Sequence, residues 1–297
     1  MQIFALDLDF QHTARTIAAY LVIGDTGPVL VETGPASTIL TLRARLAEHG
    51  YSPDDIQHVL VTHIHLDHAG AAGWWAGQGA KIYVHHVGAP HIIDPTRLLR
   101  SAHRIYGSAM DQLWGQVVPA AAEQVCSLSD GDVINICGLE FQALETLGHA
   151  SHHMVYRLGN IAFTGDIAGV RLPDAPSISL PAPPPEFDLA MWQTSLDVLD
   201  KCALSTIYPT HFGPVYRVKE HLESLSELLT ASAEFVHSAM AAGLERDDIV
   251  AHYSAWQRRR AREDGVSDQG FSAQETVNPT HMSVDGIMRY WTKQKGT

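Results

Sequence analysis

The chain has 297 residues, of which 45% are hydrophobic, and it carries a formal net charge of −13. This length and apolar content are enough for one large domain, or for a core domain with a smaller addition. The acidic balance excludes nucleic acid as a default partner, because an acidic surface repels phosphate backbones.

The sequence also lacks the patterns typical of membrane proteins and of secreted proteins. No stretch approaches the roughly 20 consecutive apolar residues of a membrane span. The N-terminus, MQIFALDLDF, has no basic region, and the three cysteines, Cys126, Cys137 and Cys202, are scattered without a CxxC pair. We therefore expect a cytoplasmic protein with no membrane partner and with structural cysteines.

The first half of the chain alternates strand and helix patterns. Short apolar runs bounded by turn residues predict the strands, and apolar residues three and four positions apart predict the helices. In chain order the predictions are strands over 16–25 and 29–33, a helix over 37–50, a strand over 58–63, a small-residue helix over 69–79, a strand over 80–86 and a helix over 96–114.

The second half begins with β-rich patterns and ends with helical ones. The predictions in chain order are a hairpin around Gly138, a hairpin with its turn at Gly159 and Asn160, a proline-rich loop or flap over 171–187, a helix over 189–202 and a strand over 205–211. From Val218 the pattern is helical, with Leu222, Leu225, Leu228 and Leu229 on one face. We predict a catalytic domain over 1–217 and a helical extension over 218–297, which packs beside the active site or forms a homodimer interface.

The stretch VTHIHLDHAG crowds four metal-ligating side chains, His63, His65, Asp67 and His68, directly after a predicted strand. In an extended segment His63 and His65 turn to the same side, and the small residues that follow let a backbone approach a metal closely. Four such ligands in six residues are too many for one ion held by one loop. They suit two ions, each of which takes a pair.

Three further candidates, His149, Asp166 and His211, lie far along the chain. Each follows an apolar run that is predicted to be a strand, in the segments ETLGH, AFTGD and IYPTH. Loops at strand ends are where ligands converge on a rigid sheet. The shared placement separates these three residues from the other histidines and aspartates of the chain.

All seven residues, in this order, resemble the signature of the metallo-β-lactamase-fold hydrolases, and the resemblance covers roughly Thr16 to Pro214. It implies an α/β fold, the αββα sandwich of that family, here with a C-terminal helical extension. It also implies two divalent metal ions, zinc in the first place and iron or manganese as alternatives. One ion would take His63, His65 and His149, the other would take Asp67, His68 and His211, and Asp166 would bridge them.

The resemblance further implies a hydrolase that cleaves a small-molecule substrate, a carboxylic ester, thioester or lactone, through a metal-bridging hydroxide. Asp67 and Asp166 are the implied catalytic residues, and Asp67 can pass a proton to the leaving group. A phosphodiesterase of the same fold and a persulfide dioxygenase-like enzyme with one iron are the alternatives. A metal-binding module without activity is the alternative outside enzymes.

Departures from related families narrow the expected chemistry. The bridging Asp166 stands where true β-lactamases of this fold have cysteine or serine, which favours the branch of glyoxalase II-like enzymes and lactonases. Many acyl-homoserine lactonases have a tyrosine three residues after the bridging aspartate, and Gly169 stands at that position here. Glu32 replaces the common aspartate before Thr-Gly, where it can support a ligand loop or cap the next turn.

Apolar side chains near these motifs are candidates for the wall of a substrate pocket. They come from the predicted helix over 96–114, from the flap and from the segment after the last ligand. Ordinary core packing is the competing interpretation for each of them. The candidates are Tyr106, Met110, Trp114, Leu172 and Phe212.

Overall fold

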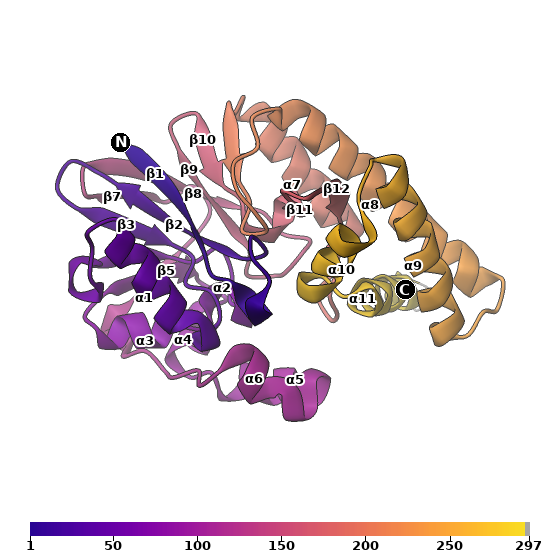
Figure 1. Cartoon of the computed structure of the whole chain (residues 1–297), viewed down its shortest axis with the longest axis horizontal. Coiled ribbons are helices and arrows are strands. Elements are labelled where there is room, and N and C mark those ends of the chain that lie inside the picture. Colours follow the sequence, from indigo (N-terminus) through magenta and orange to yellow (C-terminus); the bar gives the residue numbers. More distant parts are fainter. Residues whose placement is uncertain (295–297) are drawn as a thin grey trace. The chain divides into compact units, whose positions relative to one another are not determined.

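The computed structural model describes residues 1–294 and divides the chain into two compact units. Unit 1 consists of Met1–Glu145 with His152–Gly165, and unit 2 consists of Thr146–Ser151 with Asp166–Thr297. Residues 295–297, the end of the predicted helical extension, lie outside the described part. Unit 1 carries most of the β-structure, and unit 2 carries the long helices (Figure 1).

The first sheet of unit 1 has six strands in sequential order. They are β1 (Gln2–Asp7), β2 (Ala18–Ile23), β3 (Pro28–Val31), β4 (His58–Leu60), β5 (Lys81–His85) and β6 (Val125–Leu128). Pairing is antiparallel from β1 to β3 and parallel from β3 to β6. Parallel strands need crossover connections, which here contain α1 (Ile39–Glu48), α3 (Ala72–Gly77) and α4 (Ala89–Ile93) (Figure 1). The sequence did not predict β1, β6 or α4.

The second sheet of unit 1 is built from two hairpins. Its strands in this unit are β7 (Val133–Ile136), β8 (Leu139–Glu145), β9 (Met154–Leu158) and β10 (Ile161–Phe163), all antiparallel. Cys137 and Gly138 turn the first hairpin with φ of 52° and 75°, the positive values that a two-residue type I′ turn requires. Both predicted hairpins are confirmed, including the turn at Gly159 and Asn160.

Aromatic side chains join the two sheets of unit 1 face to face. The rings of Tyr20 on β2 and Phe163 on β10 have centroids 5.5 Å apart, and Phe141 on β8 lies 6.4 Å from Phe163. All three side chains are buried. Fully burying an apolar side chain of this size contributes about 1.5–3 kcal/mol, so this core anchors the strands whose ends carry the candidate ligands.

The predicted helix over 96–114 is interrupted. It consists of α5 (Thr96–Tyr106) and α6 (Met110–Trp114), which are separated by a short 3-10 turn. Gly107 begins that turn with a φ of 53°, a conformation that ends an α-helix and that glycine adopts at little cost. The break changes the direction of the chain, so that the ring of Trp114 contacts the ring of Tyr106, with centroids 5.0 Å apart.

Unit 2 confirms the predicted helical tail. Within unit 2, α7 (Leu189–Lys201) and the short strand β13 (Thr206–Tyr208) precede the tail, which consists of α8 (Val218–Ala241), α9 (Arg246–Glu263), α10 (Asp268–Val277) and α11 (Thr280–Gln294). The leucines predicted to share one face of α8 are all buried. None of the described helices is both long enough and apolar enough to cross a membrane.

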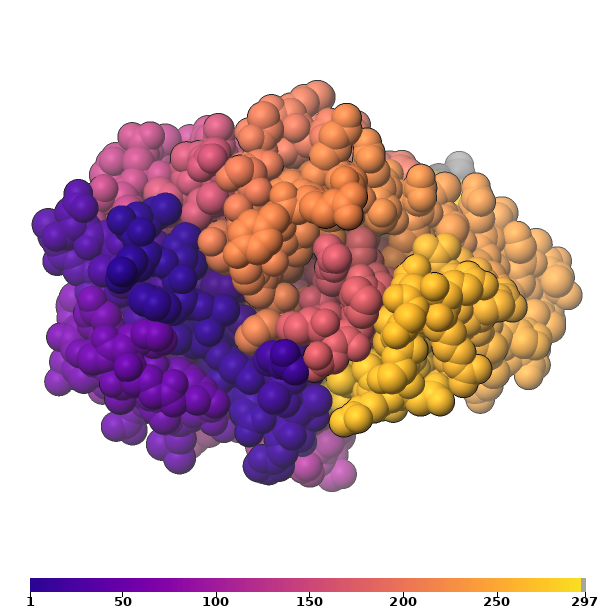
Figure 2. Space-filling view, turned by 45° about the horizontal axis from the view of Figure 1, so that its top comes forward, coloured from indigo at the N-terminus to yellow at the C-terminus, as the bar shows by residue number. Residues whose placement is uncertain are grey.

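The proline-rich segment over 171–187 is only partly irregular. The prediction of a loop is wrong for its first part, where β11 (Val170–Leu172) and β12 (Ala175–Ser179) form a two-stranded antiparallel sheet. Apolar residues stabilise this hairpin, because Leu172 packs with Phe271 in a buried cluster. Figure 2 shows salmon-coloured residues of this part of the chain between orange residues and the yellow residues of the C-terminal part.

The predicted boundary after residue 217 does not coincide with the division between the two units. The hairpin of β11 and β12 belongs to unit 2 because it packs against α8, α9 and α10. The two compact units therefore divide the chain at other positions than residue 217. The catalytic domain over 1–217 and the helical extension over 218–297 remain a prediction.

Candidate metal centre

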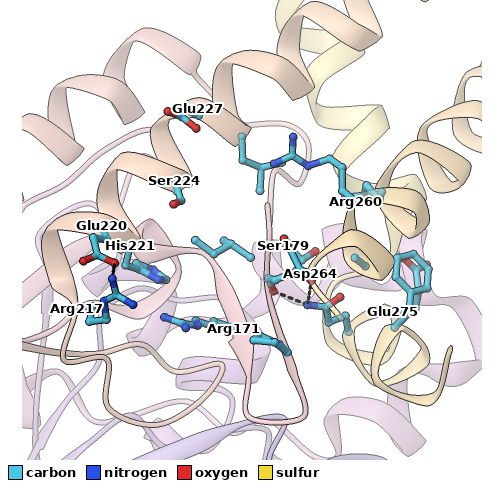
Figure 3. A pocket seen from close by; sticks show the side chains of 18 residues that line it. Arg171, Ser179, Arg217, Glu220, His221, Ser224, Glu227, Arg260, Asp264 and Glu275 are labelled. Atoms are coloured by element: carbon cyan, nitrogen blue, oxygen red, sulfur yellow. Dashed lines mark hydrogen bonds and ion pairs between the residues drawn. The ribbon is translucent and has the colours of Figure 1, made fainter. Parts of the chain in front are cut away.

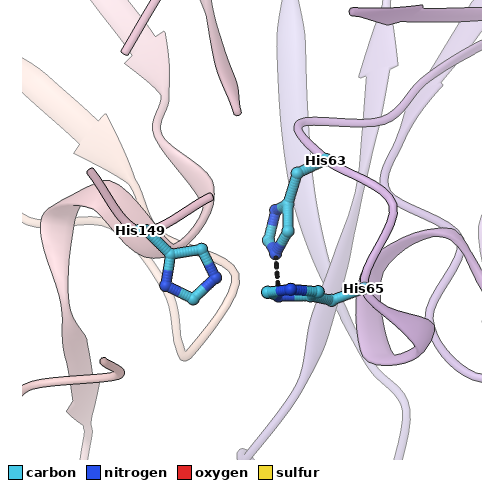
Figure 4. A group of neighbouring side chains, drawn as sticks. All are labelled: His63, His65 and His149. Atoms are coloured by element: carbon cyan, nitrogen blue, oxygen red, sulfur yellow. Dashed lines mark hydrogen bonds between the residues drawn. The ribbon is translucent and has the colours of Figure 1, made fainter. Parts of the chain in front are cut away.

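Four of the seven candidate ligands follow β4 in unit 1. The chain runs from β4 through His63 and His65 into α2 (Leu66–Ala69), which carries Asp67 and His68. Nε2 of His63 lies 2.9 Å from Nδ1 of His65 (Figure 4), and Nε2 of His68 lies 3.5 Å from Oδ2 of Asp67. The prediction that His63 and His65 turn to the same side is therefore confirmed.

The buried carboxylate of Glu32 orients the two buried histidines of this group. Oε1 of Glu32 accepts a 2.5 Å hydrogen bond from the hydroxyl of Thr62 and lies 3.2 Å from Nδ1 of His68. A carboxylate only accepts, so the proton of His68 is on Nδ1 and its Nε2 keeps a lone pair. The Thr62 oxygen in turn lies 3.1 Å from Nδ1 of His63, which leaves Nε2 of His63 with a lone pair as well. The structure confirms that Glu32 supports the ligand loop.

Two further buried imidazoles, His152 and His153, lie behind this loop in unit 1. Their ring centroids are 6.1 Å and 5.0 Å from that of His63. Nδ1 of His152 accepts a long hydrogen bond, 3.5 Å, from the backbone N–H of Ile64. A Cβ at Gly165 would lie 2.8 Å from Nε2 of His153, so only glycine fits there. These histidines support the loop by packing.

The other three candidates, His149, Asp166 and His211, lie together in unit 2. Oδ2 of Asp166 is 3.5 Å from Nε2 of His149, and Oδ1 of Asp166 is 3.4 Å from Nε2 of His211. All three residues are buried. Each oxygen of the carboxylate thus faces a different histidine, which is the arrangement expected of a bridging ligand.

Two residues that the sequence did not single out fix the ring of His149. The carbonyl of Pro181 accepts a 2.7 Å hydrogen bond from Nδ1 of His149, which leaves the lone pair on Nε2, the nitrogen that faces Asp166. The ring of Trp192 stands perpendicular to that of His149, with centroids 5.7 Å apart. Gly148 allows this approach, because a Cβ there would lie 2.4 Å from Cα of Trp192.

The spacing of these side chains fits divalent metal ions. Zinc bonds to nitrogen or oxygen are about 2.0–2.2 Å long and tetrahedral, so two ligands of one ion lie about 3.4 Å apart. The separations of 3.4 Å and 3.5 Å around Asp166, and 3.5 Å between Asp67 and His68, match this distance, whereas the 2.9 Å between His63 and His65 is that of a direct hydrogen bond. A direct charge-assisted hydrogen bond would be about 2.7–2.9 Å long. The two units therefore contain His/Asp groups that could hold metal ions.

A separate group in unit 1, His85, His86 and Glu145, also has the composition of a metal site. Hydrogen bonding argues against an ion there. Nδ1 of His85 accepts the N–H of Val87 at 3.2 Å, so the ring proton is on Nε2, which donates to Glu145 at 2.8 Å. Burial lowers the pKa of His85 even beside Glu145, which keeps the ring neutral. The hydrogen bond between His85 and Glu145 therefore links the last residue of β5 to the last residue of β8.

Three of the five predicted pocket residues lie in unit 1. The ring of Tyr106 contacts Trp114 edge-on, and Trp114 in turn stacks on Phe10 with centroids 5.6 Å apart. Burial and the nearby charge of Asp67 raise the pKa of the Tyr106 hydroxyl well above its usual range. Met110, at the start of α6, is partly buried. Tyr106 therefore belongs to an aromatic cluster that reaches the neighbourhood of Asp67.

The other two predicted pocket residues, Leu172 and Phe212, lie in unit 2. Leu172 is 3% exposed and packs in a hydrophobic cluster with Val266 and Phe271, and Phe212 packs against the same cluster. This environment is that of core residues. Their contact with a substrate stays a prediction.

The fold and the two sets of side chains define a class: an α/β protein with His/Asp groups suited to divalent metals. Comparison with known families identifies it further. The sequence model of the metallo-β-lactamase superfamily matches residues 12–211, and the chain belongs to that superfamily. The predicted family and fold class are thereby confirmed.

Individual relatives agree with this assignment. The chain is 24% identical over 212 residues to a metallo-β-lactamase fold-containing protein of Sulfurisphaera tokodaii, and the aligned region covers 69% of this chain and 77% of that protein. It is 28% identical over 146 residues to a hydroxyacylglutathione hydrolase of Xylella fastidiosa, where it spans 49% of this chain but only 43% of the relative. The crystal structure of a metallo-β-lactamase family protein from Thermus thermophilus superposes with a TM-score of 0.71 at 21% identity, over 99% of this chain and 94% of that one.

Proposed function

We propose that the protein is a dinuclear metal-dependent hydrolase that cleaves a carboxylic ester, thioester or lactone. The observation that carries the proposal is the geometry of Asp166, whose two oxygens face different histidines at the separation of ligands that share an ion. Membership of the metallo-β-lactamase superfamily supports a metal-dependent hydrolase.

Two sets of ligands follow from this proposal. His63, His65 and His149, which are labelled in Figure 4, would hold one ion. Asp67, His68 and His211 would hold the other, and Asp166 would bind both. The hydrogen bonds described above leave lone pairs on Nε2 of His63, His68 and His149, so these rings are already in the tautomer that a metal requires.

Two divalent ions in such a site would lower the pKa of a bound water toward neutrality and polarise the carbonyl of the substrate. The chain supplies the proton transfer and the positioning. The side chain of Asp67 is 18% exposed, so its carboxylate can accept a proton from the attacking water and deliver it to the leaving group. Glu32 holds His68 while this occurs, and Tyr106 presents an apolar face and a neutral hydroxyl near Asp67.

Among the three substrate classes, a thioester has support from a relative, because hydroxyacylglutathione hydrolases are named for a thioester substrate. The tyrosine that follows the bridging aspartate in many acyl-homoserine lactonases would not fit at position 169 of this chain. Gly169 has a φ of 74°, and a Cβ there would lie 2.8 Å from Cγ2 of Ile178. We therefore rank thioesters and simple esters above homoserine lactones.

Elemental analysis and a turnover screen on the same purified sample test the proposal. We expect about two ions per chain, turnover on a panel of esters, thioesters and lactones, and loss of turnover with a chelator that Zn²⁺, Mn²⁺ or Fe²⁺ reverses. His65→Ala and Asp166→Ala should abolish turnover and reduce the metal content. His252→Ala and Asp197→Ala, at exposed positions, are the matched controls.

Wild-type turnover in His65→Ala and Asp166→Ala would show that the metal mechanism is wrong. Bis-p-nitrophenyl phosphate belongs in the same panel. Faster turnover of that phosphodiester than of every ester would replace the proposed carboxylic substrate with a phosphodiester, and oxygen consumption with a persulfide would indicate the iron enzyme instead.

A further inference from the structure

Unit 2 contains a pocket of about 400 Å³ that none of the seven candidate ligands lines. Its walls come from β11, β12, α8, α9 and α10 (Figure 3). This volume lies within the range of about 300–1,000 Å³ that is typical of small-molecule sites. The pocket is therefore large enough for a ligand of its own, apart from the candidate metal centre.

His221 on α8 presents a buried hydrogen-bond acceptor at this pocket. The residue is 3% exposed, and its Nε2–H donates to the carbonyl of Ala168 at 2.7 Å. Its Nδ1 must then carry a lone pair, and this buried atom has no hydrogen-bond partner among the described residues. Burial lowers the pKa of His221 to about 4, so the ring is neutral near pH 7. A buried acceptor of this kind is normally satisfied, and a hydroxyl or N–H of a ligand would satisfy it.

Arg171 supplies a positive charge on the same side of the pocket. Figure 3 shows Arg171, Arg217 and His221 close to one another. Arg217 is paired with Glu220, whereas Arg171 forms no ion pair with a carboxylate anywhere in residues 1–294. A guanidinium matches a carboxylate in a bidentate hydrogen bond. This side of the pocket therefore offers a cation beside a hydrogen-bond acceptor.

The rest of the lining restricts the charge and shape of the ligand. Glu227, Asp264 and Glu275 also line the pocket (Figure 3), and their carboxylates would repel a second negative charge, so a monoanion is favoured over a polyanion. Ile178, Leu228 and Phe271 add apolar surface, which suits a short carbon chain. We propose that this pocket binds a small aliphatic hydroxy-carboxylate, with the carboxylate on Arg171 and the hydroxyl donating to Nδ1 of His221.

The same two residues are joined to the segments that carry candidate metal ligands. Ala168, the acceptor for His221, lies in the short 3-10 turn that contains Asp166. The backbone N–H of Arg171 donates to the carbonyl of His211 at 2.6 Å. A ligand that shifts His221 or Arg171 therefore acts on the positions of Asp166 and His211. Binding in the pocket and metal binding are consequently coupled, and such coupling is reciprocal.

Calorimetric titration of the metal-loaded full chain with 3-hydroxyhexanoate tests the site. Hexanoate lacks the hydroxyl and 1,3-hexanediol lacks the carboxylate, so each should bind more weakly than 3-hydroxyhexanoate. Arg171→Gln should weaken binding of 3-hydroxyhexanoate by about tenfold or more, because it removes a charged hydrogen bond. His221→Gln should weaken 3-hydroxyhexanoate but leave hexanoate unchanged. Arg289→Gln, an exposed arginine on α11, is the matched control.

A carboxylate could also bind at the metal centre, and the variants separate the two sites. Undiminished binding in Arg171→Gln would place the ligand elsewhere and overturn the proposal, as would the absence of binding to the wild type. Chelator competition measures the coupling. The Kd for Zn²⁺ should change when 3-hydroxyhexanoate is present in the wild type and not in Arg171→Gln, and an unchanged Kd in both would refute the coupling. The binding test stands even if no ester is cleaved, so its failure is distinct from failure of the proposed function.

Discussion

Glu32→Gln tests whether a buried carboxylate sets the metal affinity of the loop that carries His63 and His68. Glutamine has almost the same shape as glutamate but no charge, and its amide can present an N–H where a carboxylate only accepts. In the wild type one oxygen of Glu32 serves both Thr62, at 2.5 Å, and His68, at 3.2 Å. The substitution therefore removes the charge that holds the proton of His68 on Nδ1.

The size of the effect follows from these two hydrogen bonds. A hydrogen bond to a charged group contributes about 1.5–3 kcal/mol, and a neutral one contributes about 0.5–1.5 kcal/mol. Losing the charge at both bonds therefore costs about 2–3 kcal/mol of the free energy that orients the ligands. Since about 1.4 kcal/mol is a factor of ten, we expect Zn²⁺ affinity to fall by about 30- to 100-fold, within the range known for residues behind metal ligands.

Competition with a chromophoric chelator measures this change, and turnover at saturating metal shows whether the loaded site still works. Glu140→Gln, an exposed position on β8, is the matched control. Glu32→Asp restores the charge with a shorter reach, so it should lie between glutamate and glutamine in affinity. Unchanged Zn²⁺ affinity in Glu32→Gln, with a normal melting temperature, would refute the role assigned to Glu32.

Three further predictions concern other parts of the chain. Gly148→Ala should destabilise the protein by more than about 2 kcal/mol in urea unfolding, because the new Cβ would lie 2.4 Å from Cα of Trp192 and the φ of 125° is strained for alanine. The pKa of His221 is about 4 in the folded protein against an ordinary 6.5, so the stability that it contributes is complete above pH 6.5 and is lost as the pH falls toward 4. That loss should approach roughly 3 kcal/mol, and the pH dependence of unfolding should be flatter in His221→Gln. Tyr106→Ala should raise KM for apolar esters by about tenfold or more, while Leu172→Ala should lower the melting temperature without a selective change in KM.

The candidate ligands could be predicted from the sequence because each follows an apolar run that ends at a sheet edge. His63 and His65 are two residues apart in an extended segment, so their convergence is a local property of the backbone. The same placement made His149, Asp166 and His211 candidates, but only the family resemblance could group them around an ion, since their mutual distances of 3.4 Å and 3.5 Å depend on contacts between distant segments.

The supporting residues could not be predicted in the same way. Trp192 lies on the buried face of an ordinary amphipathic helix, and Pro181 acts through its backbone carbonyl, which has no side-chain signal. The hairpin of β11 and β12 was missed because its prolines indicate a loop, while its stability comes from packing against residues such as Phe271 and Ala261, about a hundred positions away. The break at Gly107 was hidden by apolar periodicity that continues on both sides of it.

Periodicity also cannot distinguish a pocket wall from a core, and this limit bears on the search for the substrate. Tyr106 and Leu172 have similar apolar character, yet the charge of Asp67 affects the Tyr106 hydroxyl, whereas Leu172 lies in a buried cluster with residues of α9 and α10. A substrate cleaved with the help of Asp67 should therefore place its apolar part against Tyr106. The preference for one acyl group over another, measured as kcat/KM, should therefore depend on the side chain at position 106. Variants of Arg171 should keep the acyl preference of the wild type, because Arg171 lines a pocket that contains no candidate ligand.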